Sequence, residues 1–139
     1  MNPEFILWPV VLLALFTLIL YLPLSNARVA AVKSGKTKAS TFKHNQGEPE
    51  ESLKFNNAIR NQYETPVLFY AACLTAYVSG NATTIMIILA WVYLIVKVTH
   101  TMSHVTTNKL RRRRPIFMVS CCILILIWLV LAGLMLNLF

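Results

Sequence analysis

The stretch TPVLFYAACLTAYVSGNATTIMIILAWVYLIV, residues 65–96, contains no charged side chain, and it decides the fold. It is longer than the roughly 20 residues that one helix needs to cross a hydrocarbon core about 30 Å thick. At its centre, Ser79, Gly80 and Asn81 form a strong turn signal. The stretch therefore predicts two membrane-spanning helices that are joined by a tight hairpin.

Two further uncharged blocks flank this hairpin, from Phe5 to Leu24 and from Ile116 to Phe139. Each block is long enough for one span, and a helix satisfies all the backbone hydrogen bonds that a chain in lipid cannot make to water. We therefore predict an all-α fold, an integral membrane four-helix bundle that forms a single domain over residues 1–139. The expected helices cover approximately residues 5–24, 53–79, 83–108 and 115–138.

The boundaries of these helices follow from individual residues. Glu4 and the absence of lysine or arginine before the first block argue against a signal peptide, as does the length of the apolar run, so we expect an uncleaved helix. Pro115 suits the first turn of the fourth helix. Pro66 should bend or loosen the second helix near its polar end.

The net charge of +8 arises from 13 lysine and arginine residues against 5 acidic residues. Most of the basic residues fall in the loop over residues 25–52 and its flank, and in the run Lys109 and Arg111 to Arg114. The positive-inside rule then predicts that both basic connections are cytoplasmic and that both termini lie on the non-cytoplasmic side. Anionic lipid headgroups are the nearest partners for these cations, so we exclude a nucleic-acid-binding function.

The three cysteines, Cys73, Cys121 and Cys122, are odd in number and lie within apolar helices. Cysteines in such positions are typical of small buried packing residues. Their spacing matches neither a disulfide framework nor a metal-binding pattern.

Two sets of polar residues lie at the same end of the predicted bundle, and the members of each set share one face of their own helix. A helix turns by about 100° per residue, which gathers the first set on one side of the second helix. The same geometry gathers the second set at the end of the third helix. The first set is Asn57, Arg60, Asn61 and Glu64, and the second is Lys97, His100, His104, Asn108 and Arg111.

A purely structural interpretation accounts for part of this pattern. Lys97, Lys54 and the arginine run fit interfacial side chains that extend toward the headgroups. Arg60 and Glu64 are four positions apart and could pair with each other, although an ionisable residue at the edge of a span usually faces a partner or a cavity.

His100 and His104 have the spacing of a two-histidine metal site, but no nearby carboxylate or cysteine completes it. We therefore predict no metal site. The two imidazoles would instead make hydrogen bonds across a helix interface or to a polar ligand.

Two stretches carry a family resemblance: AIRNQYETPVLFY at residues 58–70 and KVTHTMSHVTTNKL at residues 97–110. The first resembles the signature of the MAPEG family, the membrane-associated proteins of eicosanoid and glutathione metabolism, and the second resembles bacterial members. The resemblance extends over the whole chain, with its long basic first loop and tight second loop. It implies a homotrimer that binds glutathione in clefts between subunits near the cytoplasmic face.

The resemblance also implies roles for individual residues. Arg60 would bind a carboxylate of glutathione. Glu64 would accept hydrogen bonds from the amino group of the ligand, and Asn61 would add hydrogen bonds through its amide. Arg28 and His100 match further pocket residues of the family. The implied glutathione-binding set is Arg28, Asn57, Arg60, Asn61, Glu64, His100 and His104.

One departure from the family concerns catalysis. Catalytic relatives place an arginine at the start of the fourth helix, where it stabilises the glutathione thiolate. Here Ile116, Phe117 and Met118 follow Pro115, and a tyrosine of the family is replaced by His104. Arg114 lies one turn before Phe117 and is the candidate catalytic residue, with Arg111 or Arg112 as alternatives on the same face.

These features predict a glutathione-dependent transferase or peroxidase that acts on lipophilic electrophiles. Its expected partners are the lipid bilayer, further copies of itself, glutathione as co-substrate and a lipophilic small molecule. The alternative is a non-catalytic membrane protein that binds a thiol or a lipid, or serves as a structural subunit. A histidine-based metal or proton-handling site is a third hypothesis, and the sequence leaves enzyme and binder both open.

Overall fold

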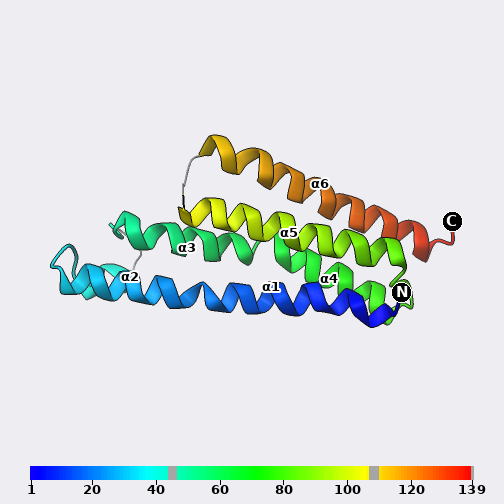
Figure 1. Cartoon of the computed structure of the whole chain (residues 1–139), viewed down its shortest axis with the longest axis horizontal. Coiled ribbons are helices and arrows are strands. Elements are labelled where there is room, and N and C mark those ends of the chain that lie inside the picture. Colours follow the sequence, from blue (N-terminus) through cyan, green and yellow to red (C-terminus); the bar gives the residue numbers. More distant parts are fainter. Residues whose placement is uncertain (44–46, 107–109, 139) are drawn as a thin grey trace.

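The computed structural model describes residues 1–43, 47–106 and 110–138, and every regular element in these ranges is helical. Four rods lie side by side, and both termini are at the same end of the bundle (Figure 1). This arrangement confirms the predicted all-α class and the four-helix count. The elements are η1 (Pro3–Ile6), α1 (Leu7–Ile19), α2 (Tyr21–Lys33), η2 (Ala39–Lys43), α3 (Glu50–Gln62), α4 (Thr65–Val78), α5 (Thr84–Thr106) and α6 (Leu110–Met135).

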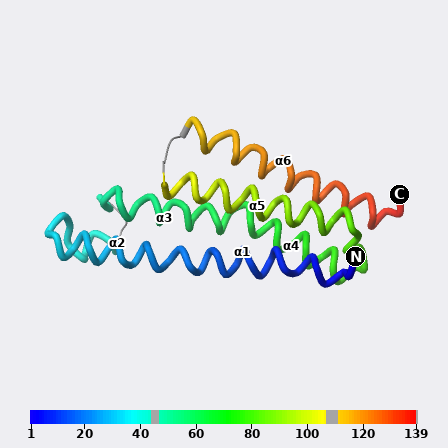
Figure 2. Tube along the Cα trace, in the orientation of Figure 1, coloured from blue at the N-terminus to red at the C-terminus, as the bar shows by residue number. Residues whose placement is uncertain are grey.

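The first rod consists of α1 and α2, and it continues beyond the expected end at Leu24 (Figure 2). It ends at Lys33, two residues before Gly35, whose φ of 72° strongly favours glycine. The Gly35 N–H donates to the Val32 carbonyl at 3.0 Å and the Lys36 N–H donates to the Ala31 carbonyl at 3.1 Å. These two bonds form a Schellman cap, so the helix includes the first part of the expected loop.

The second rod is broken into α3 and α4 at Tyr63 and Glu64. Pro66 lies in the first turn of α4 and has no N–H to donate to the preceding turn, which favours a break at this point. The predicted bend is therefore present, although residues 53–79 form two helices instead of one. The break turns neighbouring residues of the polar stripe toward different sides of the bundle.

The hairpin between α4 and α5 forms where the turn signal predicted it. Gly80 has a φ of 74°, and the Asn81 N–H donates to the Ala76 carbonyl at 2.8 Å. The Gly80 N–H completes a second Schellman cap by donating to the Tyr77 carbonyl at 3.2 Å.

The fourth rod, α6, begins at Leu110, before the expected start at Pro115. Arginine has a high helix propensity, and the proline removes only one backbone hydrogen bond, so the helix includes the basic run. Arg111 consequently lies on α6 and does not continue the polar face of α5, as the sequence pattern had suggested. Asn108 and Lys109 lie outside the described residues.

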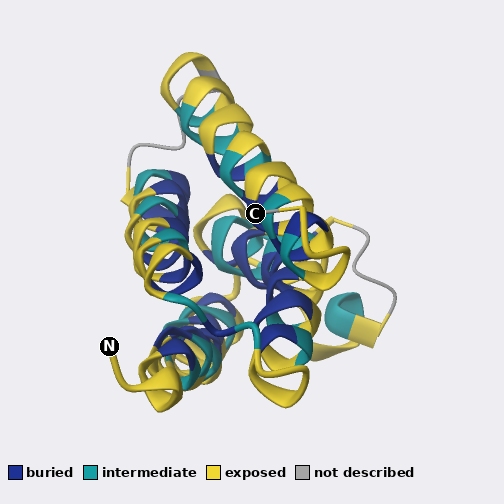
Figure 3. Cartoon of the chain, turned by 90° about the vertical axis from the view of Figure 1, so that its right-hand side faces the viewer, coloured by how far each residue is buried: buried dark blue, intermediate teal, exposed yellow. Residues whose placement is uncertain are grey.

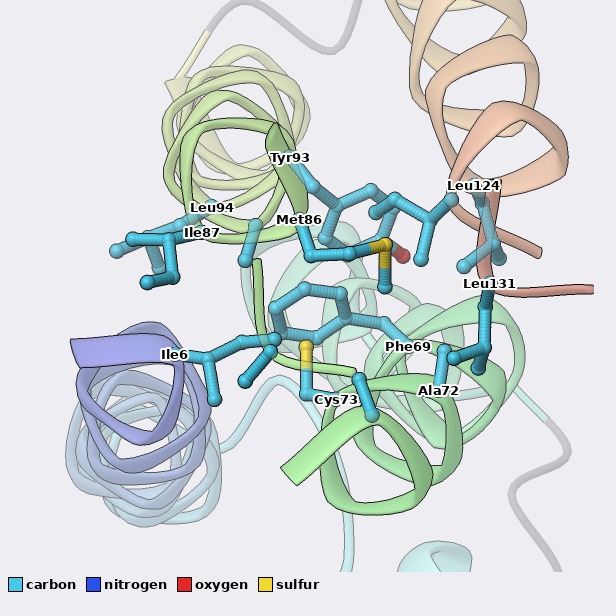
Figure 4. Packing of buried hydrophobic residues seen from close by; sticks show 14 of the residues in the cluster. Ile6, Phe69, Ala72, Cys73, Met86, Ile87, Tyr93, Leu94, Leu124 and Leu131 are labelled. Carbon is cyan, nitrogen blue, oxygen red and sulfur yellow. The ribbon is translucent and has the colours of Figure 1, made fainter. Parts of the chain in front are cut away.

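The core lies where the four rods meet, with buried faces turned inward and exposed faces outward (Figure 3). Phe69 of α4 stacks on Tyr93 of α5 with ring centroids 4.4 Å apart (Figure 4). Ala72 and Ala76 let α4 approach its neighbours closely, as small residues do in membrane bundles. Many other large apolar side chains, such as Leu18, Val78 and Ile95, are exposed, and lipid can solvate them.

Three helices of the described part are long and apolar enough to cross a membrane, namely Pro3–Lys33, Thr84–Thr106 and Arg111–Met135. These three candidate spans support an integral membrane protein. Neither α3 nor α4 is long enough to cross a membrane by itself, because the break divides the second rod.

Candidate functional site

A polar cavity of about 500 Å³ lies between α2, α3 and the short helix η2. Three of the predicted ligand-binding residues, Arg28, Arg60 and Glu64, line this first cavity. Arg60 and Glu64 are both exposed, and no ion pair joins them in the described part of the chain. The other lining residues are Tyr21, Leu24, Phe42, Asn56, Ile59 and Tyr63.

Arg28 is held against the wall of the first cavity by Glu48. Its Nε donates to Glu48 Oε1 at 2.8 Å and its Nη2 donates to Oε2 at 3.1 Å, while the Phe42 ring centroid lies 5.0 Å from the guanidinium carbon. Asn56 also donates to Glu48. Burial opposes ionisation of Glu48, but the hydrogen bonds from Arg28, Ser52 and Asn56, together with the charge of Arg28, outweigh it, so the pKa of this carboxyl falls below its ordinary value.

Replacing Glu48 by glutamine should lower the free energy of unfolding by about 1–3 kcal/mol at neutral pH, because Arg28 loses its ionic partner. Arg28 is 27% exposed, so solvent screening favours the lower end of this range. The folded-state pKa lies below the ordinary 4.5, so the carboxylate stabilises the fold above that value. This contribution disappears as the pH falls through the folded-state pKa.

Unfolding in detergent, followed by tryptophan fluorescence from neutral pH to about pH 3, measures this effect. The wild type should lose stability on acidification, and Glu48→Gln should lose less. Glu51→Gln is the matched control, because the Glu51–Lys36 pair is more than half exposed. Equal effects of the two substitutions would contradict a specific role for Glu48.

A second cavity of about 200 Å³ lies between α3, α5 and α6, and it is lined by Asn61, His100, Arg113, Arg114 and Phe117. The described lining contains two guanidinium groups and no carboxylate. Arg113 is partly buried, and Arg114 is exposed. The sequence pointed to Arg114 but not to Arg113, because the arginine run was expected to precede the helix.

The two histidines lie one turn apart on α5, with ring centroids 6.3 Å apart. Both are almost fully buried, and neither Nδ1 atom has a hydrogen-bond partner among the described residues. His100 packs against Phe117 at 5.6 Å, whereas His104 is not among the described residues that line the second cavity. The described part of the chain contains no cluster of three metal-ligating side chains around them.

Lys97 differs from its predicted interfacial role, because its side chain is fully buried. Its Nζ donates to Asn61 Oδ1 at 2.9 Å and to Thr65 Oγ1 at 2.7 Å. These acceptors lie on opposite sides of the break between α3 and α4, so the lysine joins the two halves of the rod to α5. The two predicted polar stripes therefore do meet, at Asn61 and Lys97.

A second buried polar contact anchors α3 to α5. Gln62 is buried, and its Nε2 donates to Thr101 Oγ1. The same Thr101 hydroxyl donates to the Lys97 carbonyl at 3.0 Å. The sequence pattern did not indicate Gln62, because this residue lies beside the polar stripe of Arg60, Asn61 and Glu64 and is not part of it.

The break in the second rod thus divides the predicted residues into two groups. Arg28, Arg60 and Glu64 line the first cavity, while Asn61, His100 and Arg114 line the second. Asn61 Nδ2 and Glu64 Oε2 are 3.5 Å apart, and this contact connects the groups. Asn57 is exposed on α3 and is not among the described lining residues of either cavity.

The cysteines only partly match the prediction that they are buried packing residues. Cys73 is buried, Cys121 is half-buried and Cys122 is exposed, and all three are free thiols. The prediction is therefore wrong for Cys122, which occupies the outer face of α6, where lipid can surround it.

Comparison with known proteins agrees with the sequence and the fold. The sequence model of the MAPEG family matches residues 6–133, almost the whole chain of 139 residues. Searches of curated proteins and of solved structures gave no match. The family match extends across both cavities and all four rods. The chain therefore belongs to the MAPEG family, whose members include glutathione-dependent transferases and peroxidases.

Proposed function

We propose that this protein binds glutathione in the two polar cavities and uses its thiolate to conjugate lipophilic electrophiles or to reduce lipophilic peroxides. The charge pattern of the first cavity carries this proposal. Two guanidinium groups and one carboxylate line it, and glutathione bears two carboxylates and one ammonium group. Because Glu48 already neutralises Arg28, the charges that match are those of Arg60, opposite a ligand carboxylate, and Glu64, opposite the ligand ammonium group.

In the first cavity, Arg60 would bind a carboxylate through its planar guanidinium, which matches carboxylate geometry. Glu64 would accept hydrogen bonds from the ammonium group of the ligand. Arg28 would contribute a second cation whose position is fixed by Glu48. Because Asn61 and Glu64 are in contact across the break, a bound tripeptide would extend from the first cavity toward the second.

In the second cavity, Arg113 and Arg114 would stabilise the glutathione thiolate. A cation beside a thiol favours its charged form, which is the nucleophile. The thiolate would form a bond to an electrophilic carbon while the bonding electrons leave with the leaving group. An electrophile dissolved in the bilayer would reach this site from the lipid-facing side of α6.

The expected topology and assembly fit the same proposal. The two cavities are lined by residues of α2, α3 and the ends of α5 and α6 that lie away from the two termini (Figure 1). We propose that this end of the bundle is cytoplasmic, where glutathione is available. We also propose a homotrimer. The exposed apolar side chains on α4, such as Val67 and Leu74, would then pack against neighbouring subunits.

A second candidate function is that of a non-catalytic thiol-binding protein. It is favoured by Phe117, which lines the second cavity near the position where catalytic relatives place an arginine. In that case glutathione would bind without activation of its thiol.

Calorimetric titration of the detergent-purified protein with glutathione tests the binding step. Ultraviolet absorbance of the bound thiolate and turnover of chlorodinitrobenzene test the chemistry. We expect binding, thiolate absorbance at neutral pH and conjugate formation. Absence of binding would overturn the proposal, and binding without thiolate or conjugate would support the non-catalytic alternative.

A further inference from the structure

A groove of about 390 Å³ between α4 and α6 has an almost wholly apolar lining. Its described lining residues are Thr65, Leu68, Cys121, Leu124, Ile125, Trp128 and Leu129. Leu68, Ile125 and Leu129 are more than half exposed, so the groove opens on the surface that lipid would cover. From Cys121 to Leu129 the helix rises by about 12 Å, which is comparable with the roughly 15 Å of hydrocarbon in one leaflet.

The groove begins one helical turn from the second cavity. On α6, Phe117 lines the cavity, and Cys121 lines the groove. On the second rod, Asn61 lines the cavity, and Thr65 lines the groove. The Lys97 ammonium donates to both of these side chains, at 2.9 and 2.7 Å, and it lies 5.6 Å from the Phe117 ring centroid. The polar cavity and the apolar groove therefore adjoin in front of Lys97.

Positive charge is in excess at the polar end of these adjoining spaces. Arg113 and Arg114 line the cavity, and Lys97 is buried beside it. The acidic residue that contacts this lining is Glu64, whose Oε2 lies 3.5 Å from Asn61 Nδ2. One carboxylate cannot balance three cations, and charges with little access to water strongly favour an opposite charge nearby. An anion that carries about two negative charges would restore the balance.

His100 is an independent indication that a polar group binds in the second cavity. It lines the cavity and is only 2% exposed, and its Nδ1 has no hydrogen-bond partner among the described residues. Buried polar atoms are nearly always hydrogen-bonded, so we expect a bound group to supply the partner. The N-terminal end of α6, which begins at Leu110, adds a partial positive charge that favours an anion.

We propose that phosphatidic acid, a membrane lipid with a phosphate monoester head group, binds with its phosphate in the second cavity and one acyl chain in the groove. A phosphate monoester carries a charge of about −1.5 to −2 at neutral pH and has three oxygens that accept hydrogen bonds. Arg113 and Arg114 would bind these oxygens, and His100 would add a further hydrogen bond.

The direction of the site agrees with the orientation of a lipid in a leaflet. The cavity lies at the basic end of α6, and the groove extends from it along the same helix toward the middle of the bundle (Figure 1). A head group in the cavity would therefore lie near the membrane surface, and the chain would point into the hydrocarbon. The second acyl chain would stay in the bilayer.

Bound phosphatidic acid would also regulate the glutathione reaction, a consequence that rests on the proposed function. There, Arg113 and Arg114 stabilise the thiolate of glutathione. A phosphate bound to the same two groups would exclude the thiolate, so the lipid would inhibit conjugation by competing with glutathione. Lipid binding itself does not require glutathione.

Tryptophan fluorescence tests the lipid site directly, because Trp128 lines the groove. The substitutions Trp8→Phe and Trp91→Phe leave Trp128 as the only tryptophan of the chain. This protein is placed in phosphatidylcholine nanodiscs that contain, at matched mole fractions, phosphatidic acid, phosphatidylglycerol or phosphatidylcholine with brominated chains, which quench the fluorescence. We expect the apparent affinity for phosphatidic acid to exceed that for phosphatidylcholine by at least about tenfold. Phosphatidylglycerol has a single negative charge and should lie between them.

Three variants assign the preference to the second cavity. Arg113→Ala should lower the preference for phosphatidic acid about tenfold, whereas Arg113→Lys should lower it less. Arg112→Ala is the matched control, because Arg112 is exposed and is not among the described lining residues of either space. Thermal unfolding followed by circular dichroism shows whether each variant keeps its helices.

Inorganic phosphate distinguishes a lipid from a free anion. Sodium phosphate has no chain to occupy the groove, so we expect it to reverse the quenching by phosphatidic acid only weakly. Complete reversal, or equal quenching by the three lipids together with an Arg113-dependent thermal stabilisation by inorganic phosphate, would assign the cavity to a free phosphate and overturn the lipid proposal.

Two further results would overturn the lipid site. The first is an equal loss of preference in Arg112→Ala and Arg113→Ala, which would indicate general attraction to a basic surface. The second is a lack of quenching by every brominated lipid, which would show that a second copy of the chain covers the groove.

Glutathione titration in nanodiscs with and without phosphatidic acid tests the regulation separately. We expect the lipid to weaken glutathione binding, and an unchanged affinity would overturn the competition. A lack of glutathione binding in pure phosphatidylcholine nanodiscs would overturn the proposed function, while the quenching of Trp128 would still report on the lipid site.

Discussion

Replacing Arg60 by alanine is expected to weaken glutathione binding by about 10- to 100-fold. The proposed contact joins a guanidinium to a carboxylate, and hydrogen bonds between charged groups contribute about 1.5–3 kcal/mol each. Arg60 is exposed, so its removal should leave the fold intact. Arg60→Lys keeps the charge but loses the planar pair of donors, and its affinity should lie between those of the wild type and the alanine variant.

Glu64→Gln tests the opposite charge in the same cavity. It removes the negative group that would face the ligand ammonium, so the affinity for glutathione should fall by about tenfold. Deaminated glutathione, which lacks the ammonium group, should bind equally to wild type and Glu64→Gln. Combining this variant with this ligand analogue tests one contact, the one between the Glu64 carboxylate and the ammonium group of glutathione.

Asn57→Ala is the matched control on the same helix. Asn57 is exposed and is not among the described lining residues of the first cavity, so we expect less than about a twofold change. Equal losses in Arg60→Ala and Asn57→Ala would mean that the effect comes from α3 as a whole. Unchanged binding in both Arg60→Ala and Glu64→Gln would place the ligand elsewhere.

Replacing Arg113 by alanine is expected to reduce the turnover of a generic electrophile by about 100-fold. A donor that stabilises developing negative charge is typically responsible for a factor of 100 to 1,000 in rate. Arg113 is less exposed than Arg114, and a charge interaction is stronger where less water surrounds it. For Arg114→Ala we therefore expect a smaller loss of about tenfold.

The pH dependence separates thiolate stabilisation from a loss of structure. Removing the cation raises the pKa of the bound glutathione thiol, so the pH at half-maximal turnover should move upward. Arg113→Lys restores a cation and should move it back. Arg112→Ala is the control, because Arg112 is exposed and is not among the described lining residues of the second cavity. A uniform loss of rate without a shift in the pH profile would indicate a structural role for Arg113.

Much of the fold follows from local sequence. The uncharged stretch over residues 65–96 and its central Gly80 specify a helical hairpin, because span length and turn conformation depend on neighbouring residues. Gly35 carries the same type of signal for the end of α2, and its Schellman cap could have been predicted. Pro66 likewise indicated the break in the second rod.

Part of the candidate site could also be predicted from the sequence. Helical spacing placed Arg60 and Glu64 together, and the structure brings both to the first cavity. The same spacing predicted that Asn61 lies beside them, but the break turns Asn61 toward the second cavity. A periodic pattern assumes a continuous helix, so it could not show that the stripe is divided.

By itself, the sequence determined that this protein is a bundle of membrane-spanning helices with a polar end, since hydrophobic length, charge and turn residues act locally. Only the tertiary structure decided the partners of the buried polar groups. Arg28 pairs with Glu48 across 20 positions, and Lys97 reaches Asn61 across 36. Such pairs depend on how the rods pack, and no local pattern encodes that packing. For the same reason, the sequence suggested a lysine at the membrane surface, whereas packing buried it between three helices.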